Sequence, residues 1–325
     1  MAVIERKLGK KEQISISDAE ASYGSVATLV LPLGRNATFE PNKNTPNITE
    51  ILGPAADTLD VGAREFGQED FGGVLNFVPQ DWRFLKFALL SISSDVTDTN
   101  SGGYYTHTFT NSTTGLLSFT LERAIQGTVD HVRTYEGCQI DNLSFSWDAS
   151  SPGNFLQASA DILAEDANNS TSMTDLLSSI PATEGFKPRH VLLTLGAAAV
   201  AYLKSGTFTI QNTLSDGRYA HSTLAKLKGE SSPQLRRYKL TAVAEYTDDT
   251  FFDYLDGGVV LAGTNKLVFN RGTNDELAIT FTGAYLNKAS DPTNLDGVNQ
   301  VTLEIEINNA AFVAKDALTD YETFT

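Results

Sequence analysis

The side chains that could carry out chemistry in this chain are few and poorly grouped. The 325 residues include four histidines and one cysteine. No two histidines stand at a metal-ligand spacing such as His-x-x-x-His, so neither a zinc nor a haem site is expected. The motifs of a nucleophilic serine (G-x-S-x-G) and of a phosphate-binding loop (G-x-x-x-x-G-K-[ST]) are also missing. We therefore expect no enzyme activity and no cofactor. The histidines are His107, His131, His190 and His221.

The remaining reactive groups have simple structural explanations. Cys138 has no second cysteine with which to form a disulfide, and a lone thiol of this kind is usually buried and inert. Asp248, Asp249 and Asp253 resemble an acidic site, but helix capping explains them. The stretch from Asp291 to Asp296 is typical of a Pro/Asn/Gly loop and does not match a calcium loop. No metal site is predicted.

Two acidic strands suggest a different chemistry, the repulsion of a polyanion. Apolar residues alternate with Glu304 and Glu306 in residues 301–307, and an equivalent alternation in residues 156–162 includes Asp161. Successive residues of a strand point to opposite faces, so the apolar set faces a core and the acidic set faces water. Neither polar set contains a cation. We predict that Asp161, Glu304 and Glu306 form an acidic surface that faces water and repels other polyanions.

The overall charge argues against tight binding to nucleic acid. The net charge is −16, and no stripe of clustered Lys and Arg is present. The densest basic cluster lies in residues 1–20, where a solvated arm is favoured over a nucleic-acid patch. An acidic chain can still contain DNA without holding it. The basic residues of the arm are Arg6, Lys7, Lys10 and Lys11.

The elements that must position these residues are mainly β-strands. Period-two alternation in residues 118–122, 143–147, 240–244 and 301–307 is typical of half-buried strands in an antiparallel fold. Helix is scarce by comparison, and its best candidates are residues 81–92 and 248–255. No stretch is long and apolar enough for a membrane span, and the N-terminus lacks the apolar core of a signal peptide. We expect a soluble protein, made in a cytoplasm, with no membrane partner.

Four short blocks between residues 35 and 165 recur in the same order between residues 204 and 310. The offset is about 168 for the first two blocks and about 145 for the last two, which an extra loop near residues 93–115 would explain. The general similarity of alternating strands is the competing explanation. The repeat predicts two tandem β-barrel or sandwich domains, each with a short flanking α-helix. The blocks are residues 37–39 with 206–208, 76–82 with 244–250, 134–137 with 280–283, and 156–162 with 301–307.

The repeat and the polar stretches between blocks set the expected boundaries. Residues 166–172 are polar and without periodicity, as in a domain junction. Two segments between the matched blocks are longer than ordinary connecting loops, and we expect them to make contacts between subunits. They are residues 42–67 and 214–236. The prediction is an N-terminal arm (1–24), a first domain (25–165), a linker (166–189), a second domain (190–312) and a C-terminal arm (313–325).

Several short segments resemble the tail tube (major tail) proteins of tailed phages and related archaeal viruses. Residues 20–25, EASYGS, are similar to an E-x-x-Y-G-T segment of that family, with Ser25 in place of Thr. The likeness continues through Gly72-Gly73, residues 82–90 and residues 117–123. It is clearest in residues 135–144, which look like a Y-x-G-C-x-v-x-x-l-s strand pair. The resemblance covers most of the first half, and the repeat extends it to the second.

The resemblance implies a small β-barrel or sandwich flanked by a helix, arranged in rings that stack into a hollow tube for DNA. In such a tube we predict that Asp161, Glu304 and Glu306 line the lumen, with an outer solvated face as the alternative. With two units per chain, three chains would make a pseudo-sixfold ring, stacked through the long loops and the terminal arms. The expected partners are further copies of the chain, then tail terminator, baseplate or tape-measure proteins, with viral DNA in transit. The chain would then belong to the virion tail. A carbohydrate- or receptor-binding virion protein is the alternative, which an exposed aromatic platform would favour.

Overall fold

A computed structural model of the chain describes most of its residues. The described ranges are 12–34, 36–41, 48–52, 61–66, 71–112, 115–127, 129–150, 154–176, 184–196, 198–200, 203–215, 234–245, 260–289 and 300–324.

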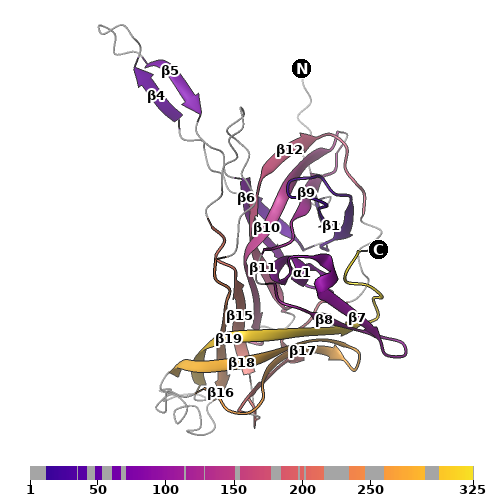
Figure 1. Cartoon of the computed structure of the whole chain (residues 1–325), viewed down its shortest axis with the longest axis vertical. Coiled ribbons are helices and arrows are strands. Elements are labelled where there is room, and N and C mark those ends of the chain that lie inside the picture. Colours follow the sequence, from indigo (N-terminus) through magenta and orange to yellow (C-terminus); the bar gives the residue numbers. More distant parts are fainter. Residues whose placement is uncertain are drawn as a thin grey trace.

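The described chain is mainly β-structure, as the alternation predicted (Figure 1). The first strands are β1 (Glu12–Ala19), β2 (Leu29–Pro32), β3 (Thr38–Pro41), β4 (Ile48–Leu52), β5 (Val61–Phe66) and β6 (Phe71–Phe77). They are followed by β7 (Val96–Asn100), β8 (Tyr105–Phe109), β9 (Phe119–Ile125), β10 (His131–Asp148), β11 (Gln157–Ala164) and β12 (Asp166–Ser170). The last are β13 (Val191–Leu195), β14 (Ala198–Ala199), β15 (Leu203–Gln211), β16 (Arg237–Glu245), β17 (Asn265–Gly272), β18 (Asp275–Ala289) and β19 (Gln300–Asp316).

The central surface is an antiparallel run of strands in the order β3-β6-β11-β10-β15-β16-β19-β18, which we call the wall sheet. Three of its strands are long enough to continue into other pairings. The first part of β10 pairs with β9 and β12. The last part of β19 pairs with β8 and with the first part of β18. In Figure 1 the β17, β18, β19 and β8 layer crosses one end of β10, β11 and β15.

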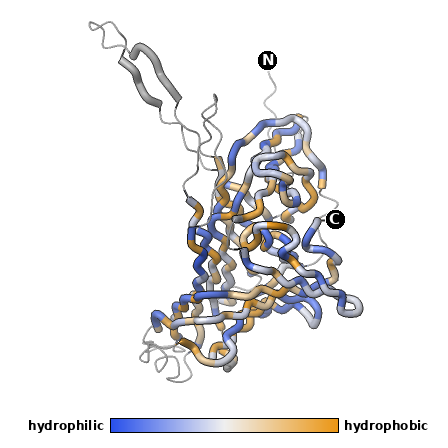
Figure 2. The backbone as a smooth tube through the Cα atoms, in the orientation of Figure 1, coloured by the Kyte–Doolittle hydropathy of each residue, from blue (hydrophilic) through white to orange (hydrophobic). Residues whose placement is uncertain are grey.

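The whole sheet is open rather than a barrel. Its pairings never return to their starting strand, and the hairpin β4–β5 pairs only with itself. The expected pair of separate barrels or sandwiches is not seen, because β10 pairs directly with β15 along residues 142–148 and 205–211. One hydrophobic cluster also runs from Ile14 to Phe324. Figure 2 shows the alternation of hydrophobic and hydrophilic residues along the strands of this sheet.

The predicted helix at residues 81–92 is present but shorter. It consists of the 3-10 turn η2 (Arg83–Leu85) followed by α1 (Lys86–Leu89). All four residues of α1 are buried, so packing rather than length holds the segment. The other short turns are η3 (Ser93–Asp95) and η5 (Pro188–His190). The predicted helix at residues 248–255 lies outside the described residues.

The predicted arms and linker turn out to include core structure. β1 pairs with β2 and β9, and its Ile14 and Ile16 are buried, so only residues 1–11 remain for an N-terminal arm. Residues 166–170 of the linker are strand β12. The C-terminal segment continues β19 to Asp316 and then docks on its own chain, burying Tyr321. The arms were expected to order only on a partner, and the described parts instead fill the chain's own core.

Candidate assembly surface

One face of the wall sheet points away from the hydrophobic core, and we call it the water face. It carries the acidic residues that the alternation identified. On β19 the side chains of Val301, Leu303 and Ile305 are buried, whereas Glu304 is half-buried and Glu306 is exposed. On β11, Asp161 is exposed between buried neighbours. The predicted division into a core face and a water face is therefore confirmed for both strands. Whether that face lines a lumen stays a prediction.

The direct cross-strand partner of Asp161 is a neutral amide. Asp161 stands opposite Asn142 of β10, whose Nδ2 donates to Asp161 Oδ2 at 3.1 Å. The same cross-strand row continues to Gln211 of β15 and Arg237 of β16. Among the described residues, Asp161 forms no ion pair. Its charge is thus exposed on the wall sheet.

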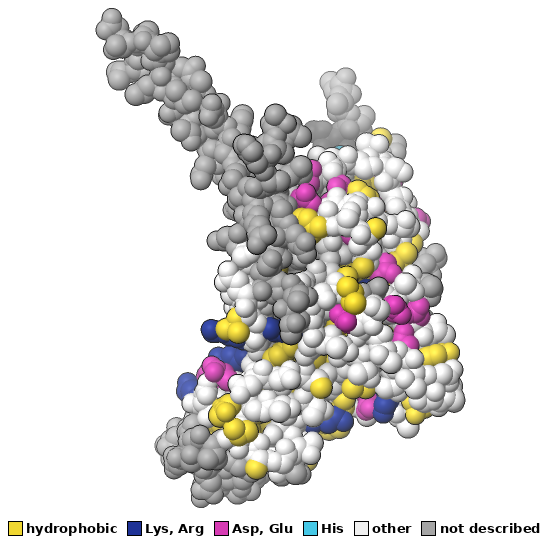
Figure 3. All heavy atoms as spheres, in the orientation of Figure 1, with side chains coloured by type: hydrophobic (Ala, Val, Ile, Leu, Met, Phe, Trp, Pro, Cys, Tyr) yellow, Lys and Arg dark blue, Asp and Glu magenta, His cyan; other side chains and the backbone are white. Residues whose placement is uncertain are grey.

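Glu304 has a different setting from Asp161. Its Oε2 lies 3.3 Å from Lys239 Nζ of β16, and its Oε1 lies 3.8 Å from Lys288 Nζ of β18. On the face shown in Figure 3, basic and acidic side chains lie together at the end where Figure 1 places β16, β18 and β19. The expectation of an acidic face without cations is wrong here, because the neighbouring strands β16 and β18 contribute lysines that residues 301–307 lack.

Other residues from the sequence analysis fall in varied places. Arg6, Lys7, Lys10, Lys11 and His221 lie outside the described residues. His131 is exposed, and Cys138 is fully buried as predicted. Burial raises the pKa of the Cys138 thiol well above its ordinary value, and nearby Glu20 adds to the effect. Within the described ranges, no cluster of acidic, histidine or cysteine side chains could hold a metal.

The two family-like motifs of the first half meet around one carboxylate. Glu20 is almost fully buried, and its Oε1 accepts hydrogen bonds from the Gly137 N–H (3.0 Å) and the Thr120 hydroxyl (2.9 Å). Its Oε2 accepts one from the Gly24 N–H (3.0 Å). The E-x-x-Y-G-S segment is thereby fixed to the Y-x-G-C segment and to β9. The sequence showed both motifs but not that they touch.

Two glycines in this cluster are required by backbone geometry. Gly24 and Gly137 have φ of 74° and 64°, in the left-handed region that favours glycine. A Cβ on Gly137 would also lie 2.8 Å from the Cβ of Glu165, which packs over both glycines. Any side chain at Gly137 would therefore meet both strain and a clash. The motif glycines are explained by the close approach of Glu165.

Glu165, which packs over the two glycines, has a raised pKa. Its Oε2 is buried without a hydrogen-bond partner in the described structure. Burial, reinforced by the charges of Glu20, Asp166 and Glu136, raises its pKa from 4.5 to about 6. The folded chain therefore holds this proton more tightly than the unfolded chain does.

We predict that Glu165→Gln stabilises the protein in a pH-dependent way. Because the folded pKa is raised, the stability linked to Glu165 is complete below about pH 4.5 and is lost as the pH rises through about 6. A neutral glutamine avoids that loss. Relative to wild type, the gain should be about 1 kcal/mol at pH 8, after allowing for solvent screening, and near zero at pH 4. Urea unfolding at both pH values measures this. An equal gain at both would contradict the assignment to ionisation.

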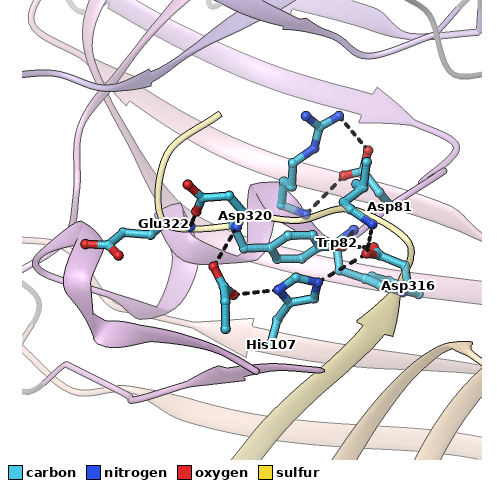
Figure 4. A network of polar contacts seen from close by, with 10 residues as sticks. Asp81, Trp82, His107, Asp316, Asp320 and Glu322 are labelled. Atoms are coloured by element: carbon cyan, nitrogen blue, oxygen red, sulfur yellow. Dashed lines mark hydrogen bonds and ion pairs between the residues drawn. The ribbon is translucent and has the colours of Figure 1, made fainter. Parts of the chain in front are cut away.

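A second polar cluster, not found from the sequence, anchors the C-terminal segment (Figure 4). His107 is buried, with Nδ1 2.6 Å from Asp98 and Nε2 3.2 Å from Asp316. Its ring stacks on Tyr321, with ring centroids 3.8 Å apart. The Tyr321 hydroxyl donates a hydrogen bond to Asp316 and accepts one from the backbone N–H of Trp82. Burial lowers the pKa of His107, but hydrogen bonds to Asp316 and Asp98 outweigh it and raise the pKa above its ordinary value. The cluster joins β8, β19 and the helix region.

Buried Lys86 completes this anchor. Its ammonium pairs with Asp18 of β1 and donates to the Glu322 carbonyl at 2.9 Å. Asp18 also accepts a hydrogen bond from the Phe324 N–H at 3.0 Å. Strand β1 and the segment 322–324 are thus tied together through α1. Sequence alone shows no signal for this contact, since the three elements are far apart along the chain.

A comparison with known protein families agrees with the resemblance found in the sequence. A family model described as "Phage tail tube protein" matches residues 9–311, and no curated protein matches the chain. No helix in the described ranges is long and apolar enough to cross a membrane. The match spans nearly the whole chain, including the Glu20 cluster and the wall sheet. The chain therefore belongs to the phage tail tube protein family, a family of structural components of the virion tail.

Proposed function

We propose that this chain assembles with copies of itself into stacked rings that form a hollow tail tube for viral DNA. Three chains would make one ring, each supplying two similar units. The role is structural and not enzymatic. Tail terminator, baseplate or tape-measure proteins would meet the tube at its ends or in its lumen, and DNA would pass without tight binding.

The observation that carries the proposal is that the two halves pair their strands in the same order. The first half has β2-β1-β9-β10-β12 and β3-β6-β11-β10. The second half has β14-β13-β17-β18-β19 and β15-β16-β19-β18. Each long strand β10 and β18 also has a left-handed glycine, Gly137 or Gly283, near its middle. This supports two tandem units derived from one fold.

The contact between the halves suggests how neighbouring chains would join. Within the chain, β10 of the first unit pairs with β15 of the second. The equivalent strands are β18 and β3, which are the two outer strands of the wall sheet. Pairing β18 of one chain with β3 of the next would repeat the internal contact around a ring.

The hairpin β4–β5 and residues 1–11 are proposed to contribute to stacking between rings. A lone two-stranded hairpin is marginally stable in water, and β4–β5 pairs with no other described strand. A neighbouring ring would supply the missing surface. The basic side chains of residues 1–11 would face an acidic neighbour, since the chain carries a net charge of −16.

Electron microscopy and native mass spectrometry of the purified full chain test the proposal. We expect tubes or rings, with a mass of three chains per ring. Rings of six full chains would contradict the two-unit arrangement, and a chain that stays monomeric at high concentration would contradict assembly. A variant lacking residues 1–11 should still form rings but stack poorly, while normal tubes would remove the arm from the mechanism.

The carbohydrate- or receptor-binding alternative gains no support from the described surface. Trp82 and Trp147 are both buried, and no Phe, Tyr or Trp whose side chain the structure describes counts among the exposed residues. An aromatic platform for a sugar ring is therefore not seen there. The structural proposal is preferred.

A further inference from the structure

The wall sheet contains a pair of lysines held by a single glutamate. The side chains of Lys239 and Lys288 are 52% and 63% exposed, whereas Glu304 between them is 32% exposed. Each ammonium contacts a different oxygen of the Glu304 carboxylate. Three strands contribute, β16, β19 and β18. One negative charge therefore lies between two positive charges on the water face of the sheet.

Strand register makes this arrangement specific to Glu304. Lys239 stands directly opposite Glu306, yet its ammonium reaches diagonally to Glu304. Lys288 stands directly opposite Glu304 from the other side. Diagonal neighbours on one face lie within reach of long side chains. Glu306 is left without an ion pair in the described structure, so the two acidic residues of β19 have different electrostatic settings.

The first half of the chain supplies an internal comparison. A register irregularity between Ile140 and Asn142 places Asn142 opposite Asp161. The same irregularity between Leu286 and Lys288 places Lys288 opposite Glu304. Asp161 and Glu304 thus occupy matching positions. Asn142 offers the carboxylate a neutral amide, whereas Lys288 offers a charge.

We infer that Glu304 is a positioning residue that holds Lys239 and Lys288 and keeps them from binding the phosphates of DNA. Without it, two exposed ammonium groups would stand together on the wall sheet, beside Arg237, which lies on the same face. Clustered cations on one surface are what bind the DNA backbone without regard to sequence. The inference deepens the proposed function and rests on it only for its role in DNA passage.

Fluorescence anisotropy with a short labelled DNA duplex and the unassembled full chain tests this inference. Wild type should bind little DNA. Glu304→Gln should bind DNA clearly. Its slope of log K against log salt concentration should be steeper than that of wild type by about 2, because two cations are freed to contact phosphates. Adding Lys239→Gln and Lys288→Gln to that variant should return binding to the wild-type level. Thermal unfolding verifies that each variant is folded.

Two matched controls separate this effect from net charge. Asp161→Asn and Glu306→Gln each remove one negative charge from the same face without freeing a paired lysine. Neither should gain DNA binding. If both gain as much as Glu304→Gln, or if Glu304→Gln gains none, the inference is overturned. The assay does not need tubes, so a failure of the wild type to assemble would contradict the proposed function while leaving this result readable.

Discussion

Tyr321→Ala should lower the free energy of unfolding by about 3–5 kcal/mol, the usual cost of removing a large buried aromatic side chain. Tyr321 is fully buried, stacks on His107 and bonds to Asp316 and the Trp82 N–H. Its loss would leave a cavity and unpaired polar groups under the C-terminal segment. Urea unfolding of the full chain measures the change.

Tyr321→Phe is the matched control, because it keeps the ring and removes only the hydroxyl. That variant should lose about 1–3 kcal/mol, since the Trp82 N–H and the Asp316 carboxylate lose a buried partner. The alanine variant must therefore be clearly less stable than the phenylalanine variant. Equal stability of all three proteins would mean that the C-terminal segment is not docked in solution.

Much of the strand content could be predicted because alternation is a local signal. The segments at residues 143–147, 240–244 and 301–307 fall within strands β10, β16 and β19, and residues 119–122 of the remaining segment fall within β9. The helix at residues 81–92 was placed correctly but made too long. Its apolar spacing continues to Ile92, whereas the chain leaves the helix at Leu90, whose backbone is extended.

The terminal segments could not be predicted, because what orders them is distant in sequence. The terminal arms were predicted to lie outside the core because their sequences contain few apolar residues. In the structure, Lys86 bonds both to Asp18 near one end and to Glu322 near the other. A buried charge with partners 68 and 236 residues away leaves no trace in local composition.

The candidate surface was predictable only in part, for the same reason. Alternation identified Asp161, Glu304 and Glu306 as facing water, which their exposure confirms. Reading each strand by itself missed the lysines, because Lys239 lies 65 residues from Glu304 and is brought close by register. The repeat alignment had a similar limit. It matched residues 156–162 to 301–307, whereas the register irregularities put Asp161 and Glu304 at matching positions.

Glu20→Ala should also destabilise the protein strongly, by about 3–5 kcal/mol. It would leave the Gly24 and Gly137 N–H groups and the Thr120 hydroxyl without their acceptor, and each buried unpaired group costs about 1–3 kcal/mol, not fully additively. Glu20→Gln should fall between wild type and alanine, because one oxygen acceptor remains. Urea unfolding of the purified chain gives the order.

Glu136→Ala is the matched control for Glu20→Ala, since it removes the same side chain from the neighbouring motif. Among the described residues its carboxylate accepts one exposed hydrogen bond, from Asn168 at 2.7 Å, so the loss should stay below about 1 kcal/mol. A similar loss for both variants would show that Glu20 does not hold the motifs together. The large difference is expected because Glu20 fixes the segment after β1 onto β9 and β10, and β10 in turn carries the contact with β15 that the ring would repeat.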